Sequence, residues 1–310
     1  MAEILQTDGT WSFDGVAIRI VPGRERGVHL LRQTLGELSV PLAAVAGIAF
    51  EPGRKGGRLR LRLRDGADPL AQATRGRLPD SADPYQLTVE PDRTGVAEYF
   101  AEEVRTALVL EQVPAGPTDR YLLPGPSLPI SVGAGDGTAT FDGERVRLEW
   151  NWKTEEGKKS AGTRVLTLAD ISAVEWQPSA GLENGHLRFT VPPAPSGIPP
   201  KHDPHAVELY GFKKDPLMAL VAAAVTARLP HPSAPAPGTG DEQHAGRPAL
   251  TKPGPGAAGA APADHRPPSA ATDDHDALLR RLRELGELHR SGILTDEEFS
   301  AAKQAILRRF

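Results

Sequence analysis

The sequence contains no cysteine among its 310 residues. This absence excludes disulfide bonds, thiolate nucleophiles and cysteine-ligated zinc or iron–sulfur centres. It fits a reducing compartment, and we expect the protein to be cytoplasmic.

The sequence also lacks long apolar runs. Its first eight residues, Met1–Asp8, are acidic and contain no apolar stretch of signal-peptide length. The longest apolar run, Met218–Val225, is much shorter than the roughly 18–20 residues that span a bilayer. We therefore expect a protein without a transmembrane segment.

Charge and motifs exclude further classes of function. The formal net charge of −4 is modest, so no nucleic-acid partner is expected. The sequence has no Gly-x-Ser-x-Gly elbow, no His-Glu-x-x-His zinc motif, no phosphate-binding loop and no dinucleotide fingerprint. We predict no catalytic residue, no metal site and no cofactor, and hence a protein that is not an enzyme. An enzyme acting on an unidentified small molecule stays open as an alternative.

Glycine and proline are abundant, at 32 and 30 residues, while hydrophobic residues make up 39% of the chain. Two segments concentrate the prolines. Residues 114–130 are predicted to link two domains. Residues 231–272 combine proline, alanine, glycine and serine with almost no bulky apolar residue, which predicts a disordered tether.

The most informative feature is an internal repeat. The segment Asp8–Gly15 returns as Asp136–Gly143, with aspartate, glycine and phenylalanine at matching places. Further apolar matches follow in the same order, and each copy ends in a helical pattern, at 94–111 and 214–229. The period far exceeds that of solenoid repeats, so the pattern predicts two tandem domains, at residues 3–113 and 131–230.

Within each copy the apolar residues mostly alternate, which is typical of half-buried strands. Asp14-Gly15 and Asp142-Gly143 lie between such runs and predict hairpin turns. About six or seven strands followed by one amphipathic helix predict an α+β domain. Its expected shape is a pleckstrin-homology-like sandwich or barrel closed by the helix.

The sharpest local feature is a row of cations on one predicted strand face, where leucines occupy the alternate positions. Guanidinium groups on such a face can receive phosphate or an anionic lipid surface. The alternative is a solvated face paired with carboxylates such as Glu51, Asp65 and Asp68. The second copy keeps only Arg188 at a matching place. The residues of this candidate anion site are Arg54, Lys55, Arg58, Arg60, Arg62 and Arg64.

Two other clusters favour structural interpretations. Lys201–His205 contains two imidazoles and one carboxylate, but no further ligand cluster accompanies them, which favours a surface loop over a metal site. Trp150 and Trp152 are interpreted as core or rim packing rather than as a ligand cage.

The last segment, residues 273–310, predicts a helical hairpin. A leucine row is followed by Ser291-Gly292, which ends the first helix, and Thr295–Glu298 forms a capping box for the second. A hairpin of this size rarely folds alone, so we expect it to dock on a second copy or another protein. The alternative is docking on the chain's own domains. The expected docking residues are Leu278, Leu282, Leu285, Leu288, Ile293, Phe299 and Ile306.

This last segment, through its leucine row and Ser291–Phe299, resembles the SHOCT family, the short C-terminal domain. That resemblance implies an oligomerisation or interaction module. The Asp-Gly-x-x-x-Phe-Asp-Gly openings at 8–15 and 136–143 resemble an actinobacterial family with tandem bacterial pleckstrin-homology-like domains. That resemblance implies a fold and no activity, and it carries over no functional residue.

These features together predict an intracellular adaptor or scaffold. Its β-rich domains would bind a protein or peptide, and its tethered hairpin would bind itself or a partner. The alternative is peripheral binding to anionic lipid through the arginine row, at the inner face of the membrane.

Overall fold

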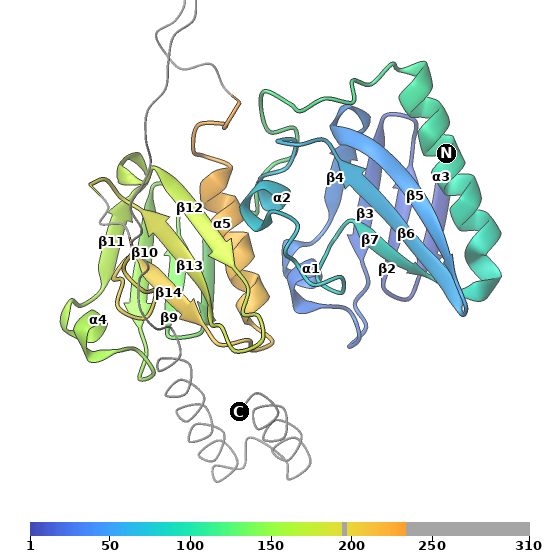
Figure 1. Cartoon of the computed structure of the whole chain (residues 1–310). Coiled ribbons are helices and arrows are strands. Elements are labelled where there is room, and N and C mark those ends of the chain that lie inside the picture. The colour runs from blue at the N-terminus through green and yellow to red at the C-terminus, as the bar shows by residue number, and fades with distance from the viewer. Residues whose placement is uncertain (194–196, 234–310) are drawn as a thin grey trace, which may run out of the picture. The chain divides into compact units, whose positions relative to one another are not determined.

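The computed structural model describes residues 1–193 and 197–233, and the described part of the chain lies within one compact unit, Met1–Glu242. The first copy of the repeat contains seven strands, three α-helices and two short 3-10 helices (Figure 1). In chain order they are β1 (Ala2–Gln6), β2 (Gly9–Phe13), β3 (Ala17–Pro22), α1 (Leu30–Leu35), β4 (Leu38–Pro41), η1 (Leu42–Ala44), β5 (Val45–Gly53), β6 (Gly56–Leu63), α2 (Pro69–Thr74), β7 (Gln86–Val89), η2 (Pro91–Arg93) and α3 (Thr94–Leu110).

The second copy repeats this order without a counterpart of α2 among its described residues. Its elements are β8 (Ile130–Ala134), β9 (Gly137–Phe141), β10 (Arg145–Trp150), α4 (Glu156–Ser160), β11 (Arg164–Thr167), η3 (Leu168–Asp170), β12 (Ala173–Gln177), β13 (Gly185–Thr190), β14 (Ala206–Leu209), η4 (Asp215–Leu217) and α5 (Met218–Thr226).

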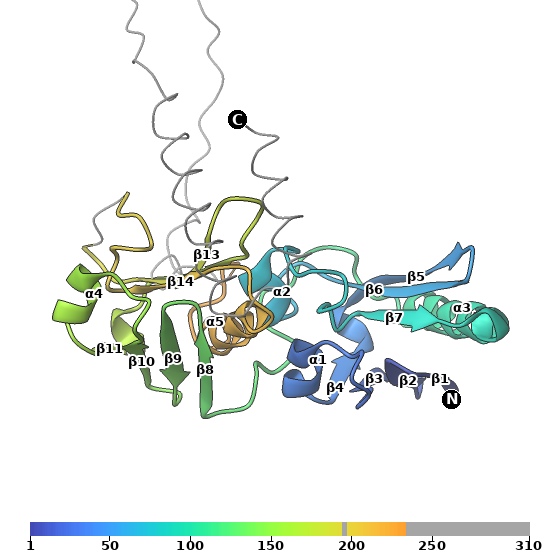
Figure 2. The same cartoon turned by 90° about the horizontal axis from the view of Figure 1, so that it is seen from below.

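Each copy is built from two antiparallel sheets and a C-terminal helix. In the first copy a sheet of order β1-β2-β3-β4 lies opposite a sheet of order β5-β6-β7, as separate layers in Figure 2. The second copy has the orders β11-β10-β9-β8 and β12-β13-β14. The predicted α+β class, with two tandem mostly-sheet domains each followed by a helix, is confirmed. No strand pairing within the described ranges joins the two sheets of a copy into a closed barrel.

The hairpin turns at the repeated motif are confirmed. The Oδ1 atom of Asp14 accepts the amide N–H groups of Val16 and Ala17, each at 2.8 Å. Asp142 accepts the amides of Glu144 and Arg145 in the same way. These hydrogen bonds lower the pKa of both carboxyl groups. The glycine after each aspartate has φ of +100° or +114°, a conformation that favours glycine.

The first aspartate of the motif joins the two sheets of each copy. In the first copy Asp8 accepts the amide of Thr88 on β7 at 3.1 Å and the guanidinium of Arg32 on α1 at 3.2 Å. The short helix between the third and fourth strands therefore supplies a cation to the first β-turn.

The second copy repeats this arrangement with different side chains. Asp136 accepts the amide of Glu208 on β14 at 2.8 Å and the ammonium of Lys158 on α4 at 2.6 Å. Both side chains of this ion pair are buried, with 0% exposure for Lys158 and 1% for Asp136. In both domains the aspartate of the repeated Asp-Gly opening therefore joins the first turn to the last strand and to the short helix, and we call this aspartate–cation pair the clip.

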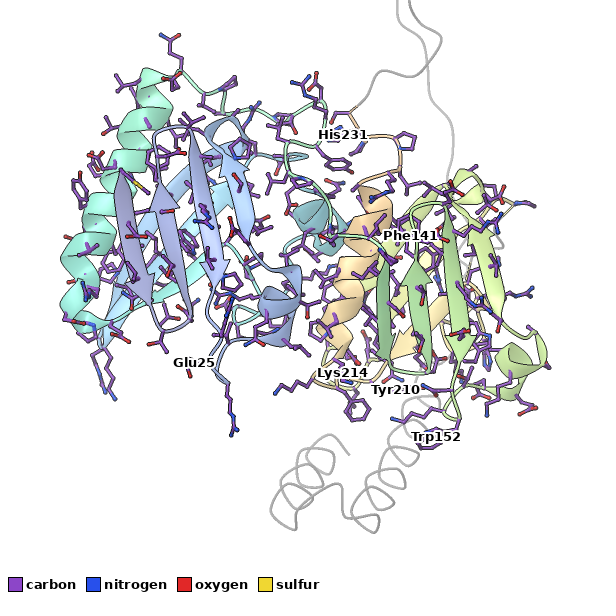
Figure 3. The ribbon with its side chains drawn as sticks, turned by 180° about the vertical axis from the view of Figure 1, so that it is seen from behind. Glu25, Phe141, Trp152, Tyr210, Lys214 and His231 are labelled. Carbon is purple, nitrogen blue, oxygen red and sulfur yellow. The ribbon has the colours of Figure 1, made fainter. Side chains whose placement is uncertain are left out.

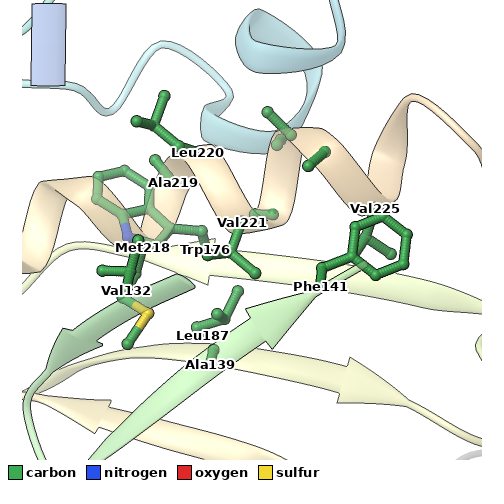
Figure 4. Packing of buried hydrophobic residues seen from close by; sticks show 14 of the residues in the cluster. Val132, Ala139, Phe141, Trp176, Leu187, Met218, Ala219, Leu220, Val221 and Val225 are labelled. Carbon is green, nitrogen blue, oxygen red and sulfur yellow. The ribbon is translucent and has the colours of Figure 1, made fainter. Parts of the chain in front are cut away.

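The two copies differ most in their closing helices. In α3 only Ala97, Phe100, Ala101 and Val104 are buried, which leaves one side of the helix exposed. In α5 all nine residues are buried, because the helix lies between the sheets of its own copy and α2 of the first copy (Figure 4). The cluster around α5 includes Leu31, Leu70 and Ala73 from the first copy. Residues of the first copy therefore extend the core of the second copy, while the first copy keeps a separate core around residues such as Trp11 and Phe100.

The chain around α2 reinforces this junction. Asp68 caps α2 by accepting the amides of Leu70 and Ala71, and it also accepts the hydroxyl of buried Tyr85 at 2.8 Å. Beyond α5, the His231 ring lies 3.0 Å from the Gly66 carbonyl oxygen. None of the helices in the described part of the chain combines the length and hydropathy that crossing a membrane requires.

Candidate interaction sites

The predicted arginine row lies on the outer face of the β5-β6-β7 sheet, opposite the buried face that carries Leu59 and Leu61. Arg58 and Arg60 both form ion pairs with Asp80, at 2.5 and 3.3 Å, and Arg60 also lies 3.9 Å from Glu51. These contacts lower the pKa of the Asp80 carboxyl, mainly through the hydrogen bond from Arg58. Two of the predicted anion ligands are therefore already neutralised within the protein.

Arg64 at the end of the row has a different role. Its guanidinium donates to the carbonyl oxygens of Gly116, Ala43 and Pro117, at 2.7, 2.9 and 3.2 Å. The bonds to Gly116 and Pro117 fasten the segment between the copies to the end of β6, and the bond to Ala43 joins η1 to the same place. Occupied in this way, Arg64 is a structural residue with little capacity left for a ligand.

The remaining cations of the row are open. Arg54 and Lys55 are exposed at the tip of the β5–β6 hairpin. Arg62 is exposed, and its side chain makes no hydrogen bond or ion pair with any residue in the described ranges. It borders a shallow hollow of about 580 Å³, above the small residues Gly47 and Ala49.

The carboxylates around the row agree only partly with the predicted partners. Glu51 lies beside Arg60 as expected, while Asp68 caps α2 and pairs with no arginine. Asp80, which takes the two strongest contacts, follows α2 in a loop and was missed. No periodicity indicates that this loop returns to the face of β6.

A groove in the first copy was also missed. It has a volume of about 520 Å³ and lies between β5 and the first turns of α3. Phe50 and Pro52 line it from the strand, and Glu98, Tyr99 and Glu102 from the helix. Arg105 closes one end by donating to the Ile48 carbonyl oxygen at 3.1 Å. The groove is therefore apolar at its centre, and its helix side carries Glu98 together with Glu102, which pairs with Arg105 at 3.5 Å.

The equivalent surface of the second copy is covered. There α2 of the first copy packs against both α5 and β12. If the inward residues Ala97 and Phe100 are aligned with Met218 and Val221, then Ala219, Leu220 and Ala223 occupy the positions of Glu98, Tyr99 and Glu102. This helix face is thus apolar in α5, where α2 covers it, and it carries two glutamates in α3, where it is open.

The other clusters singled out in the sequence have structural partners. Asp203 pairs with Arg188 at 2.9 Å and accepts the amide of His205. Within residues 1–193 and 197–233, no group of three or more His, Asp or Glu side chains is placed to hold a metal ion. Trp150 donates to the Gly162 carbonyl oxygen and packs as predicted, whereas Trp152 is 82% exposed and does not.

The buried titratable groups of the first copy are also bonded internally. Burial raises the pKa of Asp68, although the amides of α2 and the Tyr85 hydroxyl act against this rise. Burial, together with Asp68, raises the pKa of Tyr85 well above its ordinary value. The pair holds α2 in place at the junction between the copies.

The expected docking residues of the hairpin, from Leu278 to Ile306, lie outside the described residues.

The described part of the chain defines a tandem pair of helix-closed, two-sheet domains, in which α2 of the first packs against α5 of the second. The chain belongs to the family described as Domain of unknown function (DUF4429), whose model matches residues 11–105 and 139–226, more than half of the chain. The model of the Short C-terminal domain (SHOCT) matches residues 280–307. The SHOCT resemblance is confirmed, as is the tandem match to a family of unknown function, while the pleckstrin-homology-like shape of the domains stays a prediction. No curated protein matches the chain.

Proposed function

We propose that this protein is a non-catalytic intracellular adaptor. Its duplicated domains bind a protein or peptide, and its C-terminal segment binds a second copy or a partner. The observation that carries the proposal is the packing of α2 against both β12 and α5. It is an example, within the same chain, of a peptide segment bound on the surface that the first copy leaves open.

The open groove between β5 and α3 has the features of a peptide site. Phe50 and Tyr99 supply aromatic surface, and Tyr99 is 57% exposed. Aromatic side chains contribute strongly to protein interfaces. Glu98, which forms no ion pair with any described residue, favours a basic residue next to the apolar one in the partner, while Glu102 is shared with Arg105. The partner is therefore a segment that combines apolar and basic side chains.

Two further observations support a role without catalysis. The most deeply buried charged and phenolic groups, in the Asp136–Lys158 and Asp68–Tyr85 pairs, take part in bonds that join structural elements. Catalytic groups are instead expected to converge on a cavity that a substrate can enter. The family match at 280–307 supports an added interaction module, since tethered modules raise the effective concentration of their partners.

The groove is tested by selecting peptides from a random display library on the full-length protein. We expect the selected peptides to carry an aromatic or aliphatic residue beside lysine or arginine. Tyr99→Ala should weaken the best peptide at least about tenfold, as expected for an interface aromatic, and Glu98→Lys with Glu102→Lys should weaken it further. Fluorescence anisotropy of the labelled peptide measures both effects.

The matched control is Leu110→Ala, since Leu110 is 73% exposed on the same helix but outside the groove. Its affinity for the peptide should equal that of the unchanged protein. Failure to enrich any sequence, or equal binding by the Tyr99→Ala protein, would reject the groove as the peptide site.

The C-terminal segment is tested by light scattering after size-exclusion chromatography. We expect the full chain to have a higher mass than its monomer, and a chain ending at Ser233 to be monomeric. Ending at Ser233 preserves the contact of His231 with Gly66 and so protects the junction between the copies. If both proteins have the mass of a monomer, the C-terminal segment does not self-associate, and binding to another protein is the role that is left.

A further inference from the structure

The end of the second copy carries an exposed group of aromatic and basic side chains that the proposed function does not use. We call it the aromatic–lysine surface, and it consists of the half-buried Tyr210 and the exposed residues Trp152, Lys153, Phe212, Lys213 and Lys214. Trp152 is 82% exposed and Phe212 is 44% exposed. Trp11 and Trp176, by contrast, are buried at 0% and 2% exposure. Single exposed apolar side chains are ordinary, but a contiguous exposed group of aromatic side chains is typical of an interaction site.

Two loops form this surface. Trp152 and Lys153 follow β10, and Tyr210–Lys214 follow β14. The ammonium of Lys153 lies over the rings of Phe212, Trp152 and Tyr210, at 4.7, 5.4 and 5.7 Å from their centres, and so joins the loops. Figure 3 shows Trp152, Tyr210 and Lys214 at the same end of this domain.

Hydrogen bonds hold both loops in defined conformations. Asn151 donates from its side chain to the Gly135 carbonyl oxygen at 3.0 Å and accepts the amide of Lys153 at 2.8 Å. Asp215 accepts the amides of Gly211 and Phe212 at 2.7 and 3.0 Å. The exposure of Trp152 and Phe212 therefore follows from a built loop geometry, which presents the rings outward in advance of binding.

The local charge is positive although the whole chain is negative. Lys153, Lys213 and Lys214 belong to the surface, and Lys159 on α4 donates to the Trp152 carbonyl oxygen at 3.1 Å. Lys213 is close enough to His29 at the start of α1 to contribute to the lowered pKa of that imidazole, after burial. The adjoining loop of the first copy adds Arg24 and Arg26, while the acidic residues of these loops are Glu25, Glu155, Glu156 and Asp215.

The first copy has no such aromatic residues at the matching turns. Gly23-Arg24 follows β3 where Asn151-Trp152 follows β10, and Glu90–Asp92 follows β7 where Tyr210–Phe212 follows β14. The aromatic–lysine surface is thus an addition to the shared fold. Its residues are not needed to build the domain.

We propose that the aromatic–lysine surface binds an anionic phospholipid bilayer and inserts Trp152 and Phe212 at the level of the headgroups. Tryptophan favours that region because its ring is apolar and its N–H is polar. Flanking lysines extend along apolar surface while their ammonium groups contact anionic headgroups. A surface of projecting loop residues suits a broad fluid interface, whereas the groove beside α3 suits a peptide.

The test uses the full-length protein and two kinds of vesicle, one of phosphatidylcholine alone and one of phosphatidylcholine and phosphatidylglycerol in equal parts. We expect sedimentation with the second kind only, and weakening by added salt. Tryptophan fluorescence should shift to the blue on binding, because Trp152 leaves water. Soluble glycerol 3-phosphate should give no such shift, which distinguishes a bilayer from a free phosphate ligand.

Variants locate the surface. Trp152→Ala, and separately Lys213→Gln with Lys214→Gln, should each lower vesicle partitioning about tenfold or more. Two controls should bind as the unchanged protein does. Val165→Ala removes another exposed apolar side chain, of 55% exposure, and Arg62→Gln removes one of the open cations of the arginine row.

Equal binding to neutral vesicles, or full binding by the Trp152→Ala protein, would overturn the proposal. A blue shift with polyglutamate or single-stranded RNA in place of vesicles would also overturn it, because the surface would then recognise an acidic macromolecule. Loss of binding in Arg62→Gln alone would move lipid binding to the arginine row. None of these outcomes depends on the peptide groove, so the two proposals fail separately.

Discussion

Replacing Lys158 by methionine is expected to lower the free energy of unfolding by roughly 3–5 kcal/mol, the cost of removing one partner from a buried ion pair. The Lys158 ammonium donates to Asp136 at 2.6 Å and to the carbonyl oxygens of Ala206 and Pro200 at 2.7 and 3.2 Å. It also lies 4.5 Å from the centre of the Trp150 ring. Methionine fills similar space but leaves three acceptors without their donor, in a site that solvent does not reach.

The aspartate makes this loss severe. Burial raises the pKa of Asp136, and Lys158 and the Glu208 amide oppose that rise by stabilising the charged carboxylate. Without the ammonium, the carboxylate is buried with its charge uncompensated. Adding Asp136→Asn to Lys158→Met should therefore recover a large part of the lost stability, since the double variant removes both charges.

The first copy offers a matched comparison. Arg32→Met breaks the equivalent pair, but the Asp8 side chain is 23% exposed and water can take over part of the interaction. Its cost should be smaller than that of Lys158→Met. Urea unfolding followed by circular dichroism measures all four proteins. A loss below about 1 kcal/mol for Lys158→Met would contradict the assignment of the pair as a clip.

Local features of the fold were predictable because they depend on neighbouring residues. Asp14-Gly15 and Asp142-Gly143 form turns through bonds to amides two and three residues away, and glycine is needed there for positive φ. Alternation along β1 and β2 leaves residues such as Ile4 and Trp11 buried. A repeated sequence then carries these assignments from one copy to the other.

Contacts between distant segments were not predictable in the same way. Asp80 reaches Arg58 only because the loop after α2 passes over the outer sheet, and no pattern in the loop records that path. Arg64 likewise looked like one more member of a charged row, yet it binds three carbonyl oxygens. A strand pattern indicates which face a side chain is on, but not what covers that face.

The predicted packing of Trp152 was wrong, because the strand pattern was extended past its end. Trp150 and Trp152 are two residues apart, and a strand would place them on the same side. The strand ends at Trp150, however, and Asn151 begins a turn. The two indoles therefore part, with one packed against Lys158 and the other in solvent.

The uniformly apolar sequence of α5 was a further signal. A helix with apolar residues on every side is expected to be covered on every side, and Met218–Thr226 has this composition while α3 does not. The difference in composition between α3 and α5 thus indicates which of the two helices is covered on both sides: α5 packs against its own sheets and against α2, whereas one side of α3 is exposed. The contact between α5 and α2 can therefore be tested by placing the same charged residue at aligned positions of the two helices.

Replacing Leu220 by aspartate is expected to lower the free energy of unfolding by at least about 3 kcal/mol, since large-to-small core changes alone cost about 2–5 kcal/mol and a buried unpaired charge adds to this cost. Leu220 is 1% exposed and lies on the side of α5 that faces α2 (Figure 4). Tyr99→Asp changes the aligned position of α3, which is 57% exposed, and should alter stability by no more than about 0.5 kcal/mol.

The same substitution also tests whether the copies act as one unit. If α2 and α5 hold them together, Leu220→Asp should expose the segment around α2 to proteases, and Leu70→Ala on the opposite side should act in the same direction. Limited proteolysis with mass spectrometry locates the new cleavage sites, and calorimetry measures the stability. Equal stability of the Leu220→Asp and Tyr99→Asp proteins would mean that the two helix faces are equally solvated, and the packing of α2 against α5 would have to be abandoned.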